Sequence, residues 1–185
     1  MGKYILDDIV TIIVLYNCSC LESTSYKNLK ENGVRVIVCD NSTRDYGNKN
    51  IVESDGYIYI NMNGNKGLSK AYNAALNQIS DDCQFICLFD DDTNISKEYF
   101  DKSLEYMNVE EADIFLPIVK TETKVLSPCQ FKNKKVIEVR NSNEIDKNTH
   151  LQSDAEPVTK ALSLKLSYRQ QYRKQVFRCG LLLNK

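Results

Sequence analysis

Residues 9–16 read Ile9-Val10-Thr11-Ile12-Ile13-Val14-Leu15-Tyr16, an almost unbroken run of apolar and mostly β-branched side chains that stops at Asn17. β-Branched residues favour strands, and a run without polar alternation is typical of a strand that is buried on both faces. Strands of this kind occur in parallel sheets that helices cover on each side. The run therefore predicts the first strand of an α/β domain.

Similar patterns follow along the chain. Further strands are predicted at 34–39, 56–62, 84–89 and 112–119, helices at 21–32, 68–79 and 96–107, and a loop between the second and third strands. The helix at 68–79 has one apolar stripe at helical spacing, formed by Leu68, Ala71, Tyr72, Ala75, Leu76 and Ile79. Because parallel neighbours require crossover connections, this order predicts a mainly parallel sheet flanked by helices. Weaker patterns predict short antiparallel strands at 124–131 and 135–139.

Polar residues follow three of the predicted strands. They are Tyr16-Asn17, Asp40-Asn41 and Asp90-Asp91-Asp92. In open α/β sheets, ligands bind beyond the carboxyl ends of the strands. We therefore expect these three polar tips to converge on one crevice.

The acidic run Asp90-Asp91-Asp92 is the strongest chemical signal. Three neighbouring carboxylates repel one another unless a divalent cation or solvent offsets their charge. Strand alternation predicts that Asp90 and Asp92 share one side and that Asp91 faces the other. A surface turn that caps the next helix is the main alternative. A calcium loop is disfavoured because Ile95 stands where Gly is required.

The loop Asn65-Lys66-Gly67 precedes a predicted helix. Free N–H groups and the helix dipole favour an anion there, and Lys66 or Lys70 adds positive charge. A diphosphate suits such a position. The alternative is an ordinary loop with solvated lysines.

Composition limits the remaining chemistry. The chain has 24 basic and 25 acidic residues, so no strong net field would attract nucleic acid. Its seven cysteines include no CxxC pair and its one histidine is His150, which leaves zinc too few ligands. A hard, oxygen-liganded ion, Mg²⁺ or Mn²⁺, is therefore the expected metal. Cys18 and Cys20 have no histidine nearby, which disfavours a nucleophilic role.

Targeting signals are few. Asp7 and Asp8 interrupt any signal-peptide core, and no apolar run approaches the roughly 20 residues that span a bilayer. A cytoplasmic location is expected. The basic stretch 160–174 is a candidate for peripheral contact with the inner face of the membrane, and the alternative is a solvated helix face.

Four segments together resemble family 2 glycosyltransferases, especially the rhamnosyltransferase-like branch. They are Leu15-Tyr16-Asn17, Cys39-Asp40-Asn41-Ser42, residues 65–75 and Phe89-Asp90-Asp91-Asp92-Thr93. The resemblance implies the GT-A fold and a dTDP- or UDP-linked sugar donor whose diphosphate is bridged by Mg²⁺ or Mn²⁺. It also implies inverting transfer to a growing polysaccharide or lipid-linked glycan.

The resemblance also implies a set of site residues. Tyr16 and Asp40 would contact the base or ribose, Asp90 the ribose, and Asp92 the metal. The full nucleotide-sugar-binding set is Tyr16, Asn17, Asp40, Asn41, Asn65, Lys66, Gly67, Lys70, Asp90 and Asp91.

The resemblance covers residues 8–120, so we expect a nucleotide-sugar-binding core at 1–120 and a partial acceptor-side region with a basic tail at 121–185. Family members are usually longer and carry a catalytic base in an acidic motif on the acceptor side. Asp154 and Glu156 are only weak counterparts. A glycosyltransferase is therefore the expected function, and the alternative is a truncated, non-catalytic sugar-nucleotide-binding module. Truncation of the chain is a hypothesis. The donor sugar, the acceptor and the oligomeric state stay open.

Overall fold

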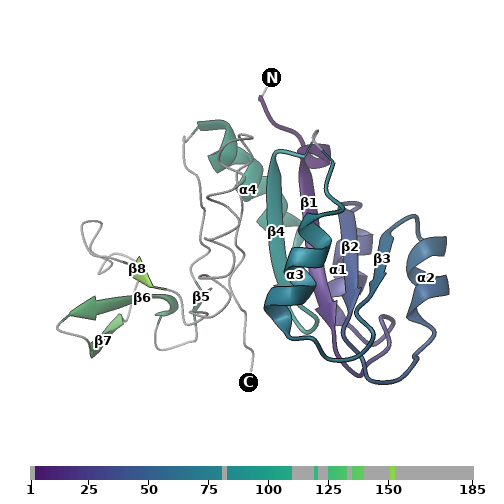
Figure 1. Ribbon diagram of the computed structural model, residues 1–185. Helices are drawn as coiled ribbons and strands as arrows, with labels where there is room; N and C mark the ends of the chain where they lie inside the picture. The colour runs from purple at the N-terminus through teal and green to yellow at the C-terminus, as the bar shows by residue number, and fades with distance from the viewer. Residues whose placement is uncertain are drawn as a thin grey trace.

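The computed structural model describes residues 3–80 and 83–109, together with strands at 119–120, 125–132, 135–139 and 151–152 (Figure 1). Its first sheet is entirely parallel and has the strand order β3-β2-β1-β4. The bounds are β1 (Ile9–Leu15), β2 (Arg35–Asp40), β3 (Ile58–Asn61) and β4 (Phe85–Asp90). The predicted mainly parallel α/β sheet is confirmed, and it is consistent with a GT-A fold.

Strand β1 is the centre of this sheet. It pairs with β2 on one side and β4 on the other, so that Ile13 lies between Val38 and Phe89. All seven of its residues are buried. An unbroken apolar run is stable here because both faces of the strand are covered.

Helices cover both faces of the sheet. They are α1 (Thr24–Glu31), α2 (Asn48–Ser54), α3 (Leu68–Leu76) and α4 (Lys97–Val109), and a short 3₁₀ turn, η1 (Leu6–Asp8), precedes β1. Helices α1, α2 and α4 contribute to the core cluster that contains Ile9 and Ile13, whereas α3 packs with Val10 and Ile12 on the opposite face. Figure 1 shows α3 in front of the sheet and α1 behind it.

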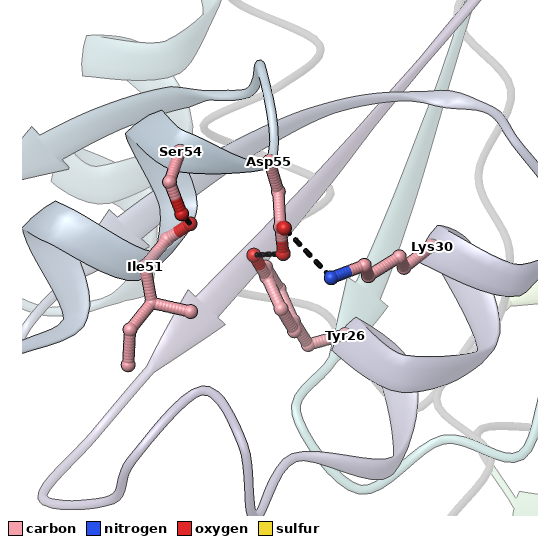
Figure 2. Close-up of polar contacts among 5 residues, drawn as sticks. All are labelled: Tyr26, Lys30, Ile51, Ser54 and Asp55. Carbon is pink, nitrogen blue, oxygen red and sulfur yellow. Dashed lines mark hydrogen bonds and ion pairs between the residues drawn. The ribbon is translucent and has the colours of Figure 1, made fainter.

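A partly buried hydrogen bond and an ion pair join α1 to the end of α2 (Figure 2). Tyr26, which is 1% exposed, donates its hydroxyl to Asp55 Oδ2 at 2.7 Å. Lys30 Nζ contacts Asp55 Oδ1 at 2.6 Å. The hydrogen bonds from Lys30 and Tyr26 lower the pKa of Asp55, whereas burial and the bond to Asp55 raise the pKa of Tyr26. The joint therefore consists of a carboxylate held by two protonated donors.

Helices α2 and α3 differ from the sequence expectations. Helix α2 lies in the segment predicted to be a loop; its N-cap Gly47 provides no side-chain cap, and only Asn48 and Val52 are buried. Such a short helix has too little apolar periodicity to be recognised. The predicted stripe on α3 is wrong at both of its ends. Leu68 begins the helix and is 40% exposed, and Ile79 lies beyond Leu76, where the helix ends.

A second, antiparallel sheet contains β5 (Val119–Lys120), β6 (Val125–Lys132), β7 (Lys135–Val139) and β8 (Leu151–Gln152). The pairing of β6 with β7 confirms the predicted antiparallel strands. Most of the strand predicted at 112–119 and the tail beyond 152 lie outside the described residues.

Among the residues that the structure describes, no helix has the length and apolar character needed to cross a membrane.

Candidate functional site

Hydrogen bonds tie the tips of β1 and β2 together. The N–H of Asn41 donates to the carbonyl of Leu15 at 2.8 Å, and the N–H of Asn17 donates to Ser42 Oγ at 2.9 Å. Asn17 has a φ of 54°, a left-handed conformation that asparagine tolerates better than most residues. The structure thus brings the first two predicted tips into direct contact.

The loop before α3 joins the same cluster. Asn41 Oδ1 accepts a hydrogen bond from the N–H of Lys66 at 3.0 Å, and Asn65 Oδ1 accepts one from the N–H of Gly67 at 3.0 Å. Lys66 and Lys70 are exposed at the amino end of α3. The first N–H groups of a helix have no intrahelical partner, so this end presents donors and positive charge together.

The acidic run is held by the start of α1. Strand β4 ends at Asp90, and Asp91 and Asp92 form a turn. Ser23 Oγ donates to the carbonyl of Asp91 at 2.6 Å, and Ser25 Oγ contacts the carbonyl of Asp90. Strand alternation therefore does not extend to Asp91 and Asp92. The prediction that Asp90 and Asp92 share one side, with Asp91 on the other, does not apply. Asp90 is the last residue of β4 that pairs with β1, and the chain turns directly after it.

The carboxylates of the run differ in environment. Asp91 Oδ2 accepts a hydrogen bond from Cys18 Sγ at 3.3 Å, whereas Asp92 is exposed. Burial, followed by the hydrogen bond to Asp91, raises the pKa of Cys18 to about 12. Cys18 is therefore a neutral thiol at physiological pH. Its contact also links the loop after β1 to the tip of β4.

Asp40 is the most firmly held of the predicted site residues. It is 5% exposed, and its carboxylate accepts hydrogen bonds from Asn48 Nδ2 at 2.8 Å and from the hydroxyl of Tyr59 at 3.0 Å. Asn48 is fully buried, and its Oδ1 accepts a bond from the N–H of Cys20 at 2.8 Å. Asn48 thus connects α2, β2 and the loop after β1.

A pocket of about 540 Å³ opens beside Asp40. Its walls come from the ends of β2 and β3, the β2–α2 connection, α2 and the loop after β3. The lining residues are Asp40, Ser42, Thr43, Arg44, Asp45, Lys49, Glu53, Tyr59, Asn61, Asn63 and Gly64.

Among the predicted site residues, Asp40 alone lines this pocket. Tyr16 is 49% exposed and lies outside the lining. Sequence reasoning missed Arg44, Lys49 and Tyr59 as pocket residues. The two cations follow Asp40 in the segment predicted to be a loop. The position of Tyr59 depends on strand pairing, because Tyr59 lies opposite Val38 where β3 pairs with β2.

The described residues contain no group of three or more His, Cys, Asp and Glu side chains that would hold a metal ion by themselves. Mg²⁺ needs no such group, because it commonly binds one or two carboxylates together with substrate phosphates. The exposed carboxylate of Asp92 fits this requirement, and Asp91 is already engaged by Cys18. The assignment of Asp92 as a metal ligand stays a prediction.

Comparison with protein families matches residues 11–161 to the model described as "Glycosyl transferase family 2". No curated protein and no solved structure matches the chain. The family match spans most of the sequence and contains every polar tip described above. The chain belongs to glycosyl transferase family 2.

Proposed function

We propose that this protein transfers a sugar from a UDP- or dTDP-linked donor to a growing polysaccharide or lipid-linked glycan, with inversion at the anomeric carbon. One observation carries the proposal beyond family membership. The polar tips of β1 and β2 and the loop before α3 are hydrogen-bonded into one cluster, and a 540 Å³ pocket walled by Asp40 lies beside it. This arrangement offers neighbouring positions for a base, a ribose and a diphosphate.

In this proposal, the nucleotide base of the donor binds beside Asp40 and its diphosphate binds near the amino end of α3. Lys66 and Lys70 are exposed at that end and supply positive charge. Asp92 is the proposed ligand of Mg²⁺ or Mn²⁺, with the remaining ligands coming from the diphosphate and water. Asn17 and Asn41 hold these loops in position through the hydrogen bonds described above.

Transfer needs two chemical contributions. The acceptor hydroxyl must lose a proton to a general base, and the departing diphosphate must be stabilised. A bound divalent cation neutralises charge on the leaving diphosphate. Lys66, Lys70 and the α3 dipole act in the same direction. We assign donor binding to residues 1–120. We assign acceptor binding and the general base of the reaction to residues 121–185.

Calorimetric titration with UDP and dTDP, each with and without Mn²⁺, tests the donor site. Wild type is compared with Asp92→Ala, and Asp101→Ala is the matched control because Asp101 is an exposed carboxylate on α4. We expect binding that requires Mn²⁺, is lost in Asp92→Ala and is retained in Asp101→Ala. If neither UDP nor dTDP binds, the proposal is wrong.

A non-catalytic sugar-nucleotide-binding module is the second candidate, because the described residues supply the donor side of the reaction only. Incubation with a panel of UDP- and dTDP-sugars, followed by detection of released nucleotide, separates the two. Release that depends on Asp92 supports the enzyme. Tight binding without release, even with acceptor glycans present, supports the module.

A further inference from the structure

The amino end of α1 holds the backbone on both sides of Asp92. The carbonyl of Asp91 accepts two hydrogen bonds from this end, one from Ser23 Oγ at 2.6 Å and one from the N–H of Ser25 at 3.1 Å. The N–H of Thr93 donates to Ser25 Oγ at 2.9 Å. The residues before and after Asp92 are therefore both bonded to α1, although they lie more than sixty residues away in the chain.

These bonds fix both backbone dihedral angles of Asp92. A peptide group is planar, so the φ and ψ of a residue are set by the peptide planes that precede and follow it. The carbonyl of Asp91 belongs to the plane before Asp92, and the N–H of Thr93 belongs to the plane after it. Because α1 holds both planes, it determines the direction of the Cα–Cβ bond of Asp92.

The side chain of Asp92 has no other support among the described residues. Asp92 is exposed, and no residue that the structure describes donates a hydrogen bond to its carboxylate. The carboxylate of Asp91, in contrast, is held by Cys18 Sγ at 3.3 Å. The orientation of Asp92 therefore depends on the backbone of the turn, and the turn depends on α1.

The same face of α1 also holds the end of this turn. Ser25 and Asn28 are three residues apart, so they lie on one face of the helix. Asn28 Oδ1 accepts a hydrogen bond from the N–H of Ile95 at 2.9 Å. Ser25 is fully buried and Ile95 is 4% exposed, so water competes little for these bonds. The turn is therefore bonded to α1 along its length.

We propose that Ser23 and Ser25 are positioning residues for the metal site, which hold Asp92 in the orientation in which it binds the divalent cation. The inference rests on the proposed function, because only there is Asp92 a metal ligand. Mg²⁺ demands near-ideal octahedral geometry. A carboxylate whose backbone is fixed in advance binds such an ion without the entropic cost of ordering the turn. Groups that orient a metal ligand contribute about 10–100-fold to metal affinity.

Calorimetric titration with UDP or dTDP, whichever the wild type binds, at a series of Mn²⁺ concentrations tests the inference in Ser23→Gly and Ser25→Ala. Glycine is nearly as good a helix cap as serine, so Ser23→Gly removes the donor to Asp91 while preserving α1. Ser96→Gly is the matched control. Ser96 accepts the same kind of bond at the start of a different helix, from the N–H of Tyr99 at 3.3 Å.

The measured quantity is the Mn²⁺ concentration that supports half-maximal nucleotide binding. We expect it to rise about tenfold in Ser25→Ala. A smaller rise is expected in Ser23→Gly, because the N–H of Ser25 still holds the carbonyl of Asp91. Ser96→Gly is expected to keep the wild-type value. Urea unfolding of each variant verifies that it is folded under the conditions of the titration.

A purely structural role of the two serines predicts a different result. Both variants would then unfold at lower urea concentration but keep the wild-type Mn²⁺ requirement, and this outcome would overturn the inference while leaving the proposed function intact. Ser23→Gly decides the question by itself if Ser25→Ala does not fold. A wild type that binds neither UDP nor dTDP would instead refute the proposed function and, with it, this inference.

Discussion

Substitution of Ser25 by alanine tests how the acidic run is held. Ser25 is fully buried, and its hydroxyl accepts a hydrogen bond from the N–H of Thr93 at 2.9 Å while contacting the carbonyls of Asp90 and Thr93. Ser25→Ala leaves that N–H without its acceptor. A buried donor left unsatisfied costs about 1–3 kcal/mol, which is a large part of the stability of a domain of this size.

The assay is urea unfolding of Ser25→Ala beside Ser54→Ala. Ser54 is also a helical serine, but it is exposed and its hydroxyl donates to the carbonyl of Ile51 within its own helix, at 2.8 Å (Figure 2). Both variants gain similar helix propensity, so the control removes that contribution. With a urea dependence of about 2 kcal/mol/M, a loss of about 2 kcal/mol lowers the midpoint by roughly 1 M. Equal midpoints for the two variants would refute the view that Ser25 anchors the turn.

Two further predictions concern ionisable groups near the site and at the α1–α2 joint. Asp91 helps to raise the pKa of Cys18 to about 12, so Asp91→Asn should increase the thiolate fraction of Cys18. Alkylation of Cys18 by iodoacetamide at neutral pH should then be faster, as measured by peptide mass spectrometry. An unchanged alkylation rate would contradict the contact between Asp91 and Cys18. The pKa of Asp55 is lowered, so its bonds stabilise the fold above the ordinary carboxyl pKa and are lost as the pH falls through the lowered value. Tyr26→Phe should therefore destabilise the protein more at pH 7 than at about pH 3 in urea unfolding, and a loss that does not depend on pH would count against this coupling.

The local sequence predicted the strands well, because a strand that is buried on both faces consists mostly of apolar residues. The run at 9–16 is β1, and the strands predicted at 34–39 and 84–89 correspond to β2 and β4 within a residue at each end. The polar tips were also predictable, since turn-forming residues interrupt the apolar runs where each strand ends. The contact between the tips of β1 and β2 followed from one rule about parallel sheets.

Helix α2 was not predictable in the same way. It has seven residues, no side-chain cap and only two buried side chains, so its stability comes from packing and from the hydrogen bonds of Asn48. Missing α2 also meant missing the pocket wall that contains Lys49 and Glu53. The role of Ser25 was hidden for the same reason, because its partners are more than sixty residues away in the chain.

The sequence by itself determined the strand composition, the polar residues at the strand ends and the family resemblance, because each depends on residues close together in the chain. Tertiary structure alone decided which acidic oxygens are already occupied. Asp40 and Asp92 are both aspartates at strand ends. Asp40 is buried and accepts three hydrogen bonds, whereas Asp92 is exposed. The free acceptor capacity of a carboxylate depends on donors that distant segments bring to it, and no local pattern records that arrangement.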